Sequence, residues 1–189
     1  MYLMRKLTLR HTLRGGVGKR LVVKSPIHTA RIPLLRRLFP KAKFVYIHRH
    51  PFELFQSACR LADTAYWFCY MNTPTDDQII EFIYWQFDQM WRKYAAAAYG
   101  TDGRLLPDIL EISYLQLADR TRVVQTLERI YSFIGEVWGD DKIEHFQGQL
   151  SELVDYRPNT HTALSEATKR EIMLRWDEYF DTFDYSRDI

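Results

Sequence analysis

Two cationic side chains follow two short apolar runs in the N-terminal half of the sequence. Lys24 comes directly after residues 21–23, and Arg49 lies two positions beyond residues 44–47. Short, continuous apolar runs are typical of buried parallel strands. Open parallel sheets bind ligands outside the carboxyl ends of their strands. If the two strands are neighbours, both cations face one crevice, where they would hold an anion such as a phosphate.

A helix predicted to begin at Pro51 would strengthen this anion site. Proline is favoured at the first position of a helix, and the backbone N–H groups at a helix start attract anions. Ser57 lies eight residues beyond Arg49, where its hydroxyl could reach a phosphate held at the helix start. Each residue also has an ordinary alternative: a solvated or salt-bridged cation, or a helical serine bonded to its own backbone. The combination of residues is what predicts a site.

His28 is a candidate general base. It follows Lys24 by four residues, at the junction between a loop and a predicted helix. An imidazole there could accept a proton near neutral pH. A purely structural role, as a helix cap or as a partner of a backbone carbonyl, is about as compatible with the sequence. His48 and His50, which flank Arg49, are alternative bases, although His48 is predicted to be buried.

Other chemistries lack their sequence signatures. The six histidines and two cysteines form no HExxH or CxxC pattern, so no metal site is predicted. No GxSxG elbow of a serine hydrolase is present, and a nucleotide kinase would need a GxxxxGK[ST] loop that the sequence lacks. Cys59 and Cys69 do not make a disulfide framework.

The elements that must position these side chains can be placed from periodicity and capping signals. A helix is predicted over 2–14 and is stopped by glycines. A strand at 21–23, a helix over 29–38, a strand at 44–47 and a helix from 51 follow. This order predicts a βαβ unit with a right-handed crossover. Thr75 and Gln78 form a capping box before a helix with a long apolar stripe. Further elements are predicted as a strand at 109–112, a helix over 122–134 that ends at Gly135, and a last helix capped by Ser165. A single domain over 1–189 is the simplest account.

Positive charge is concentrated at the N-terminal end. Residues 1–50 hold 13 of the 26 lysines and arginines and no acid before Glu53, so the remainder carries a formal charge of −11. This asymmetry favours an anionic ligand in the N-terminal half. The acid-free start is also compatible with a transit peptide, but the leucine spacing over 2–14 favours a packed helix. No nucleic-acid-binding motif is visible.

No apolar run approaches the ~20 residues of a membrane span. The chain as written is expected to be soluble, with the cytoplasm favoured, while the compartment stays open because a longer parent could be membrane-anchored.

Residues 21–61, LVVKSPIHTARIPLLRRLFPKAKFVYIHRHPFELFQSACRL, resemble the central segment of sulfotransferases that use 3′-phosphoadenosine 5′-phosphosulfate (PAPS). The resemblance rests on a KxPxH loop and an FPxAKFVxxxRxP strand and turn, a specific combination. Residues 112–117 are similar to the family's strand that ends in a YxxL motif. The helix that ends at Gly135 is similar to the segment after it.

The resemblance implies an α/β fold, with a P-loop NTPase-like parallel sheet flanked by helices. It implies sulfuryl transfer from PAPS to a hydroxyl or amine, with adenosine 3′,5′-bisphosphate (PAP) as product and no metal. The acceptor could be a carbohydrate, a tyrosyl protein or a small alcohol. By position in the motifs, the resemblance implies that Arg49 and Ser57 bind the 3′-phosphate and that Lys24 contacts the sulfuryl group. It implies that His28 is the base and that Tyr114 lies near the adenine. Arg157 and His161 are weaker basic candidates.

One departure from the family's pattern is expected to matter. The family begins with a strand and a Gly-rich phosphate loop, whereas the glycines at 15, 16 and 18 precede a predicted strand and are interpreted as a turn. The chain is therefore expected to be a fragment that lacks the first strand and the phosphate loop, with an exposed sheet edge. The activity of such a fragment is in doubt. The alternative function is a catalytically inactive nucleotide-binding or scaffolding domain that retains the 3′-phosphate site.

Overall fold

A computed structural model describes residues 2–13, 20–152 and 162–188 of the chain. In chain order its elements are α1 (Tyr2–Leu13), η1 (a 3-10 helix, Pro26–Arg31), α2 (Ile32–Leu38), β1 (Phe44–His48), α3 (Pro51–Thr64), η2 (Tyr66–Cys69), α4 (Asp76–Ala98), β2 (Ile109–Ser113), α5 (Tyr114–Ala118), α6 (Val123–Ile134), α7 (Asp140–Glu152), α8 (Glu166–Arg175) and α9 (Asp177–Thr182).

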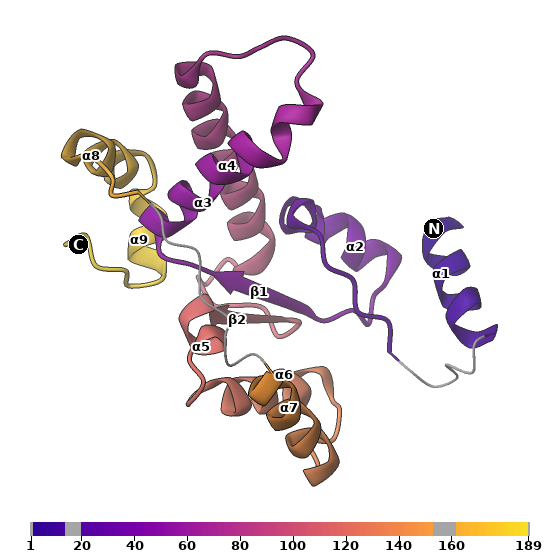
Figure 1. Cartoon of the computed structure of the whole chain (residues 1–189). Helices are drawn as coiled ribbons and strands as arrows, with labels where there is room; N and C mark the ends of the chain where they lie inside the picture. The colour runs from indigo at the N-terminus through magenta and orange to yellow at the C-terminus, as the bar shows by residue number, and fades with distance from the viewer. Residues whose placement is uncertain (1, 14–19, 153–161, 189) are drawn as a thin grey trace.

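A parallel pair of strands lies at the centre of the described chain (Figure 1). Phe44 pairs with Ile109 at one end, and His48 pairs with Ser113 at the other, so the two strands end side by side. The chain crosses from β1 to β2 through α3, η2 and α4. The strands predicted at 44–47 and 109–112, and the α/β class with helices flanking a parallel sheet, are confirmed.

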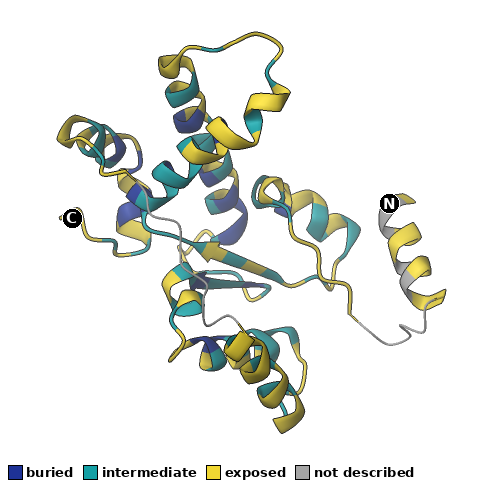
Figure 2. Cartoon of the chain, viewed as in Figure 1, coloured by how far each residue is buried: buried dark blue, intermediate teal, exposed yellow. Residues whose placement is uncertain are grey.

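The core is built where α4 meets the C-terminal helices and the inner face of β1. Trp91 and Tyr94 on α4 are buried, as are Trp176 and Tyr179 in the C-terminal region (Figure 2). The rings of Tyr46 and Tyr94 stack with their centroids 3.8 Å apart. Aromatic rings supply a large apolar area and interlock in preferred geometries, which explains how so small a sheet is held.

Local signals fix several element ends as predicted. The Thr75 hydroxyl accepts a hydrogen bond from the backbone N–H of Gln78, and Oε1 of Gln78 accepts one from the backbone N–H of Thr75, which completes the capping box of α4. Gly135 ends α6 at φ 74°, a left-handed conformation that glycine adopts without steric cost. Ser165 caps α8.

A bidentate ion pair ties three elements together. Arg36 on α2 donates to both carboxylate oxygens of Asp108, at 2.8 and 3.0 Å, and also to the carbonyl of Ala97 at the end of α4. Asp108 directly precedes β2. Paired donors of this kind fix orientation as well as adding energy, so α2 is held at one distance from the sheet.

The strand predicted at residues 21–23 is wrong. These residues form no strand, and their side chains are 44–83% exposed. A strand forms only where its backbone can pair with a neighbour. Here η1 packs against α4, and a cavity separates the segment from β1. The first strand of the predicted βαβ unit is therefore absent from the described chain, and the parallel unit that does form is β1–α3–α4–β2.

Three smaller predictions also need correction. The strand at 44–47 is covered on one face only, because Val45 and Ile47 are exposed on the other. The helix predicted over 29–38 starts earlier, as the 3-10 helix η1. The last helix breaks at Trp176 into α8 and α9, and the Tyr179 hydroxyl on α9 contacts the backbone of Arg49 at the end of β1.

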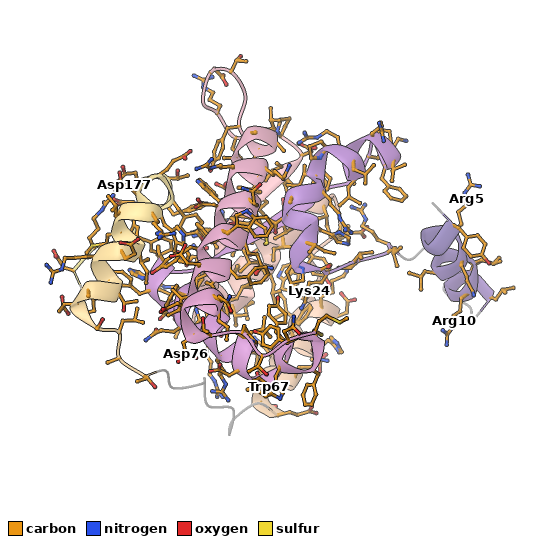
Figure 3. The ribbon with its side chains drawn as sticks, turned by 90° about the horizontal axis from the view of Figure 1, so that it is seen from above. Arg5, Arg10, Lys24, Trp67, Asp76 and Asp177 are labelled. Carbon is orange, nitrogen blue, oxygen red and sulfur yellow. The ribbon has the colours of Figure 1, made fainter. Side chains whose placement is uncertain are left out.

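The N-terminal helix α1 stands apart from the other elements (Figure 1). In Figure 3, Arg5 and Arg10 project from α1 at a distance from Lys24, which lies against the main body. The basic N-terminal block therefore does not converge as a whole on one site. None of the helices in the described ranges has the length and apolar character needed to cross a bilayer.

Candidate functional site

Arg49 lies in the two-residue turn between β1 and α3. Its Nε atom donates a hydrogen bond to Oε2 of Glu53 at 2.8 Å, and its guanidinium carbon lies 4.6 Å from the centroid of the Tyr114 ring. Tyr114 directly follows β2, so the parallel register places both residues at the same end of the sheet. The structure thus brings Arg49 and Tyr114 together. A guanidinium over a tyrosine face is a favourable cation–π contact.

Ser57 lies on α3, four residues beyond Glu53, and is half-buried. Positions four apart share one face of an α-helix. Glu53, which contacts Arg49, therefore lies on the same face of α3 as Ser57. The ion pair is the salt-bridged alternative considered for Arg49. It is surface-accessible, with both side chains between a quarter and two-fifths exposed, so an incoming phosphate could displace the carboxylate at small cost.

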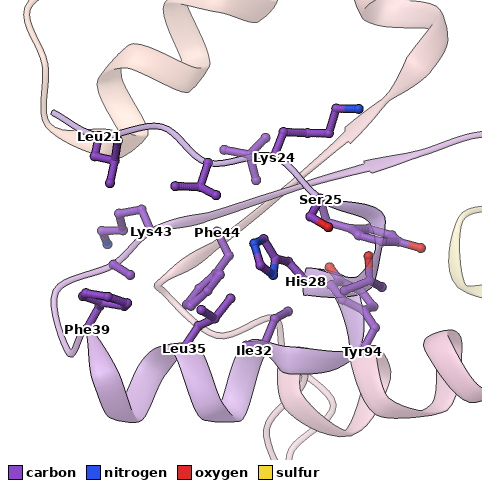
Figure 4. Close-up of a pocket in the computed structure, with 15 residues that line it drawn as sticks. Leu21, Lys24, Ser25, His28, Ile32, Leu35, Phe39, Lys43, Phe44 and Tyr94 are labelled. Carbon is purple, nitrogen blue, oxygen red and sulfur yellow. The ribbon is translucent and has the colours of Figure 1, made fainter. Parts of the chain in front are cut away.

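A cavity of about 470 Å³ lies between the extended segment before η1, the helix α2 and one edge of β1 (Figure 4). The His28 ring points into it, between Phe44 and Ile32. The Nδ1 atom of His28 is buried and has no hydrogen-bond partner. The walls are mostly apolar, and the lining comprises Leu21, Val23, Lys24, Ser25, His28, Thr29, Ile32, Leu35, Phe39, Ala42, Lys43, Phe44, Val45, Tyr46 and Tyr94.

Lys24 borders this cavity but is exposed, and its ammonium end points away from the His28 ring (Figure 4). Arg49, Ser57 and Tyr114 are not among the lining residues. The predicted site is therefore divided in the described chain. One part, at the β1–α3 turn, holds Arg49 and Tyr114, and the other holds Lys24 and His28.

Both ring nitrogens of His50 serve the fold. Nδ1 accepts a hydrogen bond from the backbone N–H of Phe52 at 3.3 Å, which caps α3, and Nε2 lies 3.0 Å from the carbonyl oxygen of Ser186. The first contact requires an unprotonated Nδ1, so Nε2 carries the proton and donates it to Ser186. Both ring nitrogens of His50 are thus occupied by hydrogen bonds within the fold.

His48 is held in a similar way. Its Nδ1 lies 2.7 Å from the Tyr185 hydroxyl, and its ring stacks on Phe183 with centroids 4.0 Å apart. Burial lowers the pKa of His48 to about 4, so the ring is neutral at physiological pH. Of the three histidines considered as the base, His28 alone lines this cavity, and its buried Nδ1 has no hydrogen-bond partner.

Acidification should destabilise the fold through His48. Burial lowers the pKa of this ring from 6.5 to about 4, so between these values the unfolded chain binds a proton that the folded chain does not. The stabilisation is therefore complete above pH 6.5 and is lost as the pH falls toward 4. We expect a loss of about 1–2 kcal/mol, allowing for solvent screening of this half-buried ring. Thermal unfolding across this range measures it. His48→Gln should flatten the profile, and an equally steep profile in that variant would assign the effect elsewhere.

A half-buried carboxylate network adjoins the cavity through Tyr46 and Tyr94. Glu111 pairs with Tyr46 in the strand register, and its Oε1 accepts hydrogen bonds from the hydroxyls of Tyr94 at 2.7 Å and Tyr99 at 2.6 Å. Burial, and then the bond to Glu111, raise the pKa of both tyrosines above the ordinary value. They stay protonated donors at physiological pH, so the network fixes the ring of Tyr94 against the cavity.

Glu53, Glu111 and Tyr179 were not predicted from the sequence as site residues. The spacing of four between Arg49 and Glu53 was an available signal, because it is the ordinary spacing of a helical ion pair. No sequence signal places Glu111 or Tyr179. Arg157, His161 and the glycine cluster at 15–18 lie outside the described residues. Within the described ranges, no group of three or more His, Cys, Asp or Glu residues could hold a metal ion.

Comparison with known proteins gives one consistent family. Residues 3–140 match the Sulfotransferase family. The omega-hydroxy-beta-dihydromenaquinone-9 sulfotransferases Stf3 of Mycobacterium bovis and Mycobacterium tuberculosis are each 25% identical to the chain over 170 residues, which cover 89% of this chain and 42% of the relative.

The crystal structure of sulfotransferase STF9 from Mycobacterium avium superposes with a TM-score of 0.69 and 21% identity, over 87% of this chain and 42% of that one. This likeness shows a shared fold. The chain spans less than half the length of these relatives. Since the family match covers most of its residues, this chain belongs to the sulfotransferase family.

Proposed function

We propose that the chain carries the nucleotide-binding and acceptor-activating parts of a sulfotransferase that moves a sulfuryl group from PAPS to a hydroxyl or amine. The family membership supports sulfuryl transfer. The observation that carries the nucleotide assignment is Arg49, held at the end of β1 with Tyr114 beneath its guanidinium. A fixed cation at a strand end, next to the start of a helix, is a suitable site for a phosphate.

In this proposal the residues keep separate roles. Arg49 and Ser57 bind the 3′-phosphate, and Tyr114 lies near the adenine. The acceptor oxygen attacks sulfur, the bond from sulfur to the bridging phosphate oxygen breaks, and PAP leaves with the electron pair. The acceptor's proton passes to the imidazole of His28, a residue that lines the cavity and whose Nδ1 has no hydrogen-bond partner. Lys24 would stabilise the charge spread over the sulfuryl oxygens, provided that its exposed side chain turns toward the donor.

The nature of the cavity bears on the acceptor. Its walls are mostly apolar around one imidazole, which suits a hydroxyl carried on an apolar body better than a carbohydrate, whose hydroxyls would each need a partner. The names of the two mycobacterial relatives also specify a hydroxylated menaquinone. We therefore place an apolar alcohol ahead of a sugar or a tyrosyl peptide as the acceptor.

The test combines binding and transfer. PAP is titrated into the chain by calorimetry, and radiolabelled PAPS is offered with a long-chain alcohol, a monosaccharide and a tyrosine-containing peptide. Binding together with sulfation of the alcohol is the expected result. A chain that does not bind PAP would overturn the proposal.

A second candidate function, a nucleotide-binding domain without turnover, is favoured by one observation. His28 and Lys24 line the cavity, and Arg49 does not, so the base and the phosphate site do not share one described cleft. PAP binding with no transfer to any acceptor would support this candidate.

Glu53→Gln should tighten PAP binding. The Glu53 carboxylate accepts a hydrogen bond from Nε of Arg49 at 2.8 Å. It therefore competes with the proposed phosphate for the guanidinium and places a negative charge next to it. Removing that charge should lower the Kd about 3- to 10-fold, on the scale of an exposed ion pair. Asp63→Asn removes an exposed carboxylate from the same helix and controls for net charge. Equal effects of the two variants would mean that Glu53 does not compete for Arg49.

A further inference from the structure

The Arg49 turn is held from outside by the C-terminal segment. Three consecutive residues, His48 to His50, each make a hydrogen bond to residues 179–186. The first two partners are the Tyr185 hydroxyl, 2.7 Å from His48, and the Tyr179 hydroxyl, on the backbone of Arg49. The third is the Ser186 carbonyl, 3.0 Å from His50. More than 125 residues separate the partners in each pair, so only the tertiary fold brings them together.

One hydroxyl serves both peptide groups of Arg49. The backbone N–H of Arg49 donates to the Tyr179 hydroxyl at 3.2 Å, and the same hydroxyl donates to the Arg49 carbonyl oxygen at 3.2 Å. Residue 49 belongs neither to β1 nor to α3, so the hydrogen-bond ladders of those elements do not supply these partners. Tyrosine suits this task because its hydroxyl both donates and accepts.

The position of the Tyr179 hydroxyl is itself fixed by packing. Tyr179 has no exposed surface. Its ring makes edge-to-face contacts with Trp91, with centroids 4.9 Å apart, and with Phe87 and Phe183 at 5.1 and 4.9 Å. A ring enclosed on several sides by other aromatic rings has little freedom to move. The hydroxyl therefore has a fixed position, and its two hydrogen bonds fix the position of the Arg49 peptide groups.

We propose that Tyr179 is a positioning residue for the anion site: it locks the Arg49 peptide so that the guanidinium projects over Tyr114, where a nucleotide phosphate would bind. The inference rests on the proposed function, since it concerns the phosphate-binding arginine. Tyr179 itself does not touch the ligand. It acts by reducing the conformational freedom that Arg49 would otherwise lose on binding.

The test is Tyr179→Phe, which keeps the packed ring and removes the hydroxyl. At 3.2 Å the bond from the Arg49 N–H is at the long end of its range, and the bond from the Tyr179 hydroxyl is longer than usual. We therefore expect a moderate effect: the Kd for PAP, measured by calorimetry, should rise about 5- to 10-fold. Tyr84→Phe is the matched control, because Tyr84 is also buried and packs on Trp176 but does not bond to Arg49. It should change the Kd less than 2-fold. A Kd for Tyr179→Phe within 2-fold of the wild type would overturn the inference.

A double-mutant cycle separates positioning from a general loss of stability. If Tyr179 acts through Arg49, then Tyr179→Phe should have no further effect on PAP affinity in an Arg49→Ala background. An undiminished effect there would show that Tyr179 contributes through the fold as a whole, and would overturn the positioning role. Should Arg49→Ala bind PAP as well as the wild type, the proposed phosphate site fails, which is a different result from failure of Tyr179 alone.

A second variant keeps the inference testable if Tyr179→Phe does not fold. Tyr185→Phe removes the hydroxyl bonded to His48, directly before Arg49, from a residue that is only half-buried. It should raise the Kd for PAP about 2- to 5-fold, on the scale of one neutral hydrogen bond. Unchanged affinity in this variant would overturn the role of the C-terminal segment in positioning the site.

Discussion

Replacing Arg49 with alanine should weaken PAP binding by about 2–4 kcal/mol, or roughly 30- to 700-fold in Kd. The structure fixes the guanidinium at the end of β1, over Tyr114 and beside the start of α3. Alanine would remove the charge-assisted bond to the 3′-phosphate and leave the phosphate facing the Glu53 carboxylate. Calorimetric titration of PAP measures the loss, and it should diminish as salt is added.

The matched control is Arg92→Ala. Arg92 also pairs with an acid four residues away in a helix, with Nη2 lying 3.7 Å from Asp88, but it is exposed on α4. The variant makes the same change in net charge at a position away from the sheet end, so it should leave PAP affinity within 2-fold of the wild type. If Arg49→Ala and Arg92→Ala bind PAP equally well, the phosphate is bound elsewhere and the nucleotide assignment has to be abandoned.

Replacing His28 with asparagine should lower the turnover of sulfuryl transfer about 10²- to 10⁴-fold, the usual contribution of a general base. Asparagine keeps a polar group of similar reach but cannot take up the acceptor's proton. The affinity for PAP should stay unchanged, because His28 lies in the cavity and not at the Arg49 turn. The measurement is kcat with radiolabelled PAPS and the best acceptor, together with a PAP titration.

His145→Asn is the control for this change, since His145 is exposed on α7. A small effect of His28→Asn on turnover would remove His28 as the base. His48 and His50 are poor replacements, because the ring nitrogens in contact with Tyr185, Phe52 and Ser186 are already used to hold the fold.

Elements with local signals were predictable from the sequence. The apolar runs at 44–47 and 109–112 became the parallel pair, and the capping residues Thr75 and Ser165 start helices as expected. Gly135 ends α6 for the same kind of reason. These signals succeed because a cap or a glycine acts on its own turn of the chain, and its effect does not depend on distant partners.

Residues 21–23 show where local reasoning fails. Their apolar, β-branched composition is suited to a strand, but a strand also needs a neighbouring backbone, and the segment faces a cavity. The same dependence on neighbours governs the site. The sequence could propose His28, His48 and His50 as bases, but only packing reveals which nitrogens are already bonded.

The sequence by itself determined the family motif, the cation at the end of β1 and the helix that follows it, because these depend on residues close together in the chain. The tertiary structure alone decided that Glu53 holds Arg49, that Lys24 and His28 line a separate cavity, and that Tyr179 anchors the Arg49 backbone from 130 residues away. Contacts of that separation form only when the whole chain packs, so no local pattern encodes them.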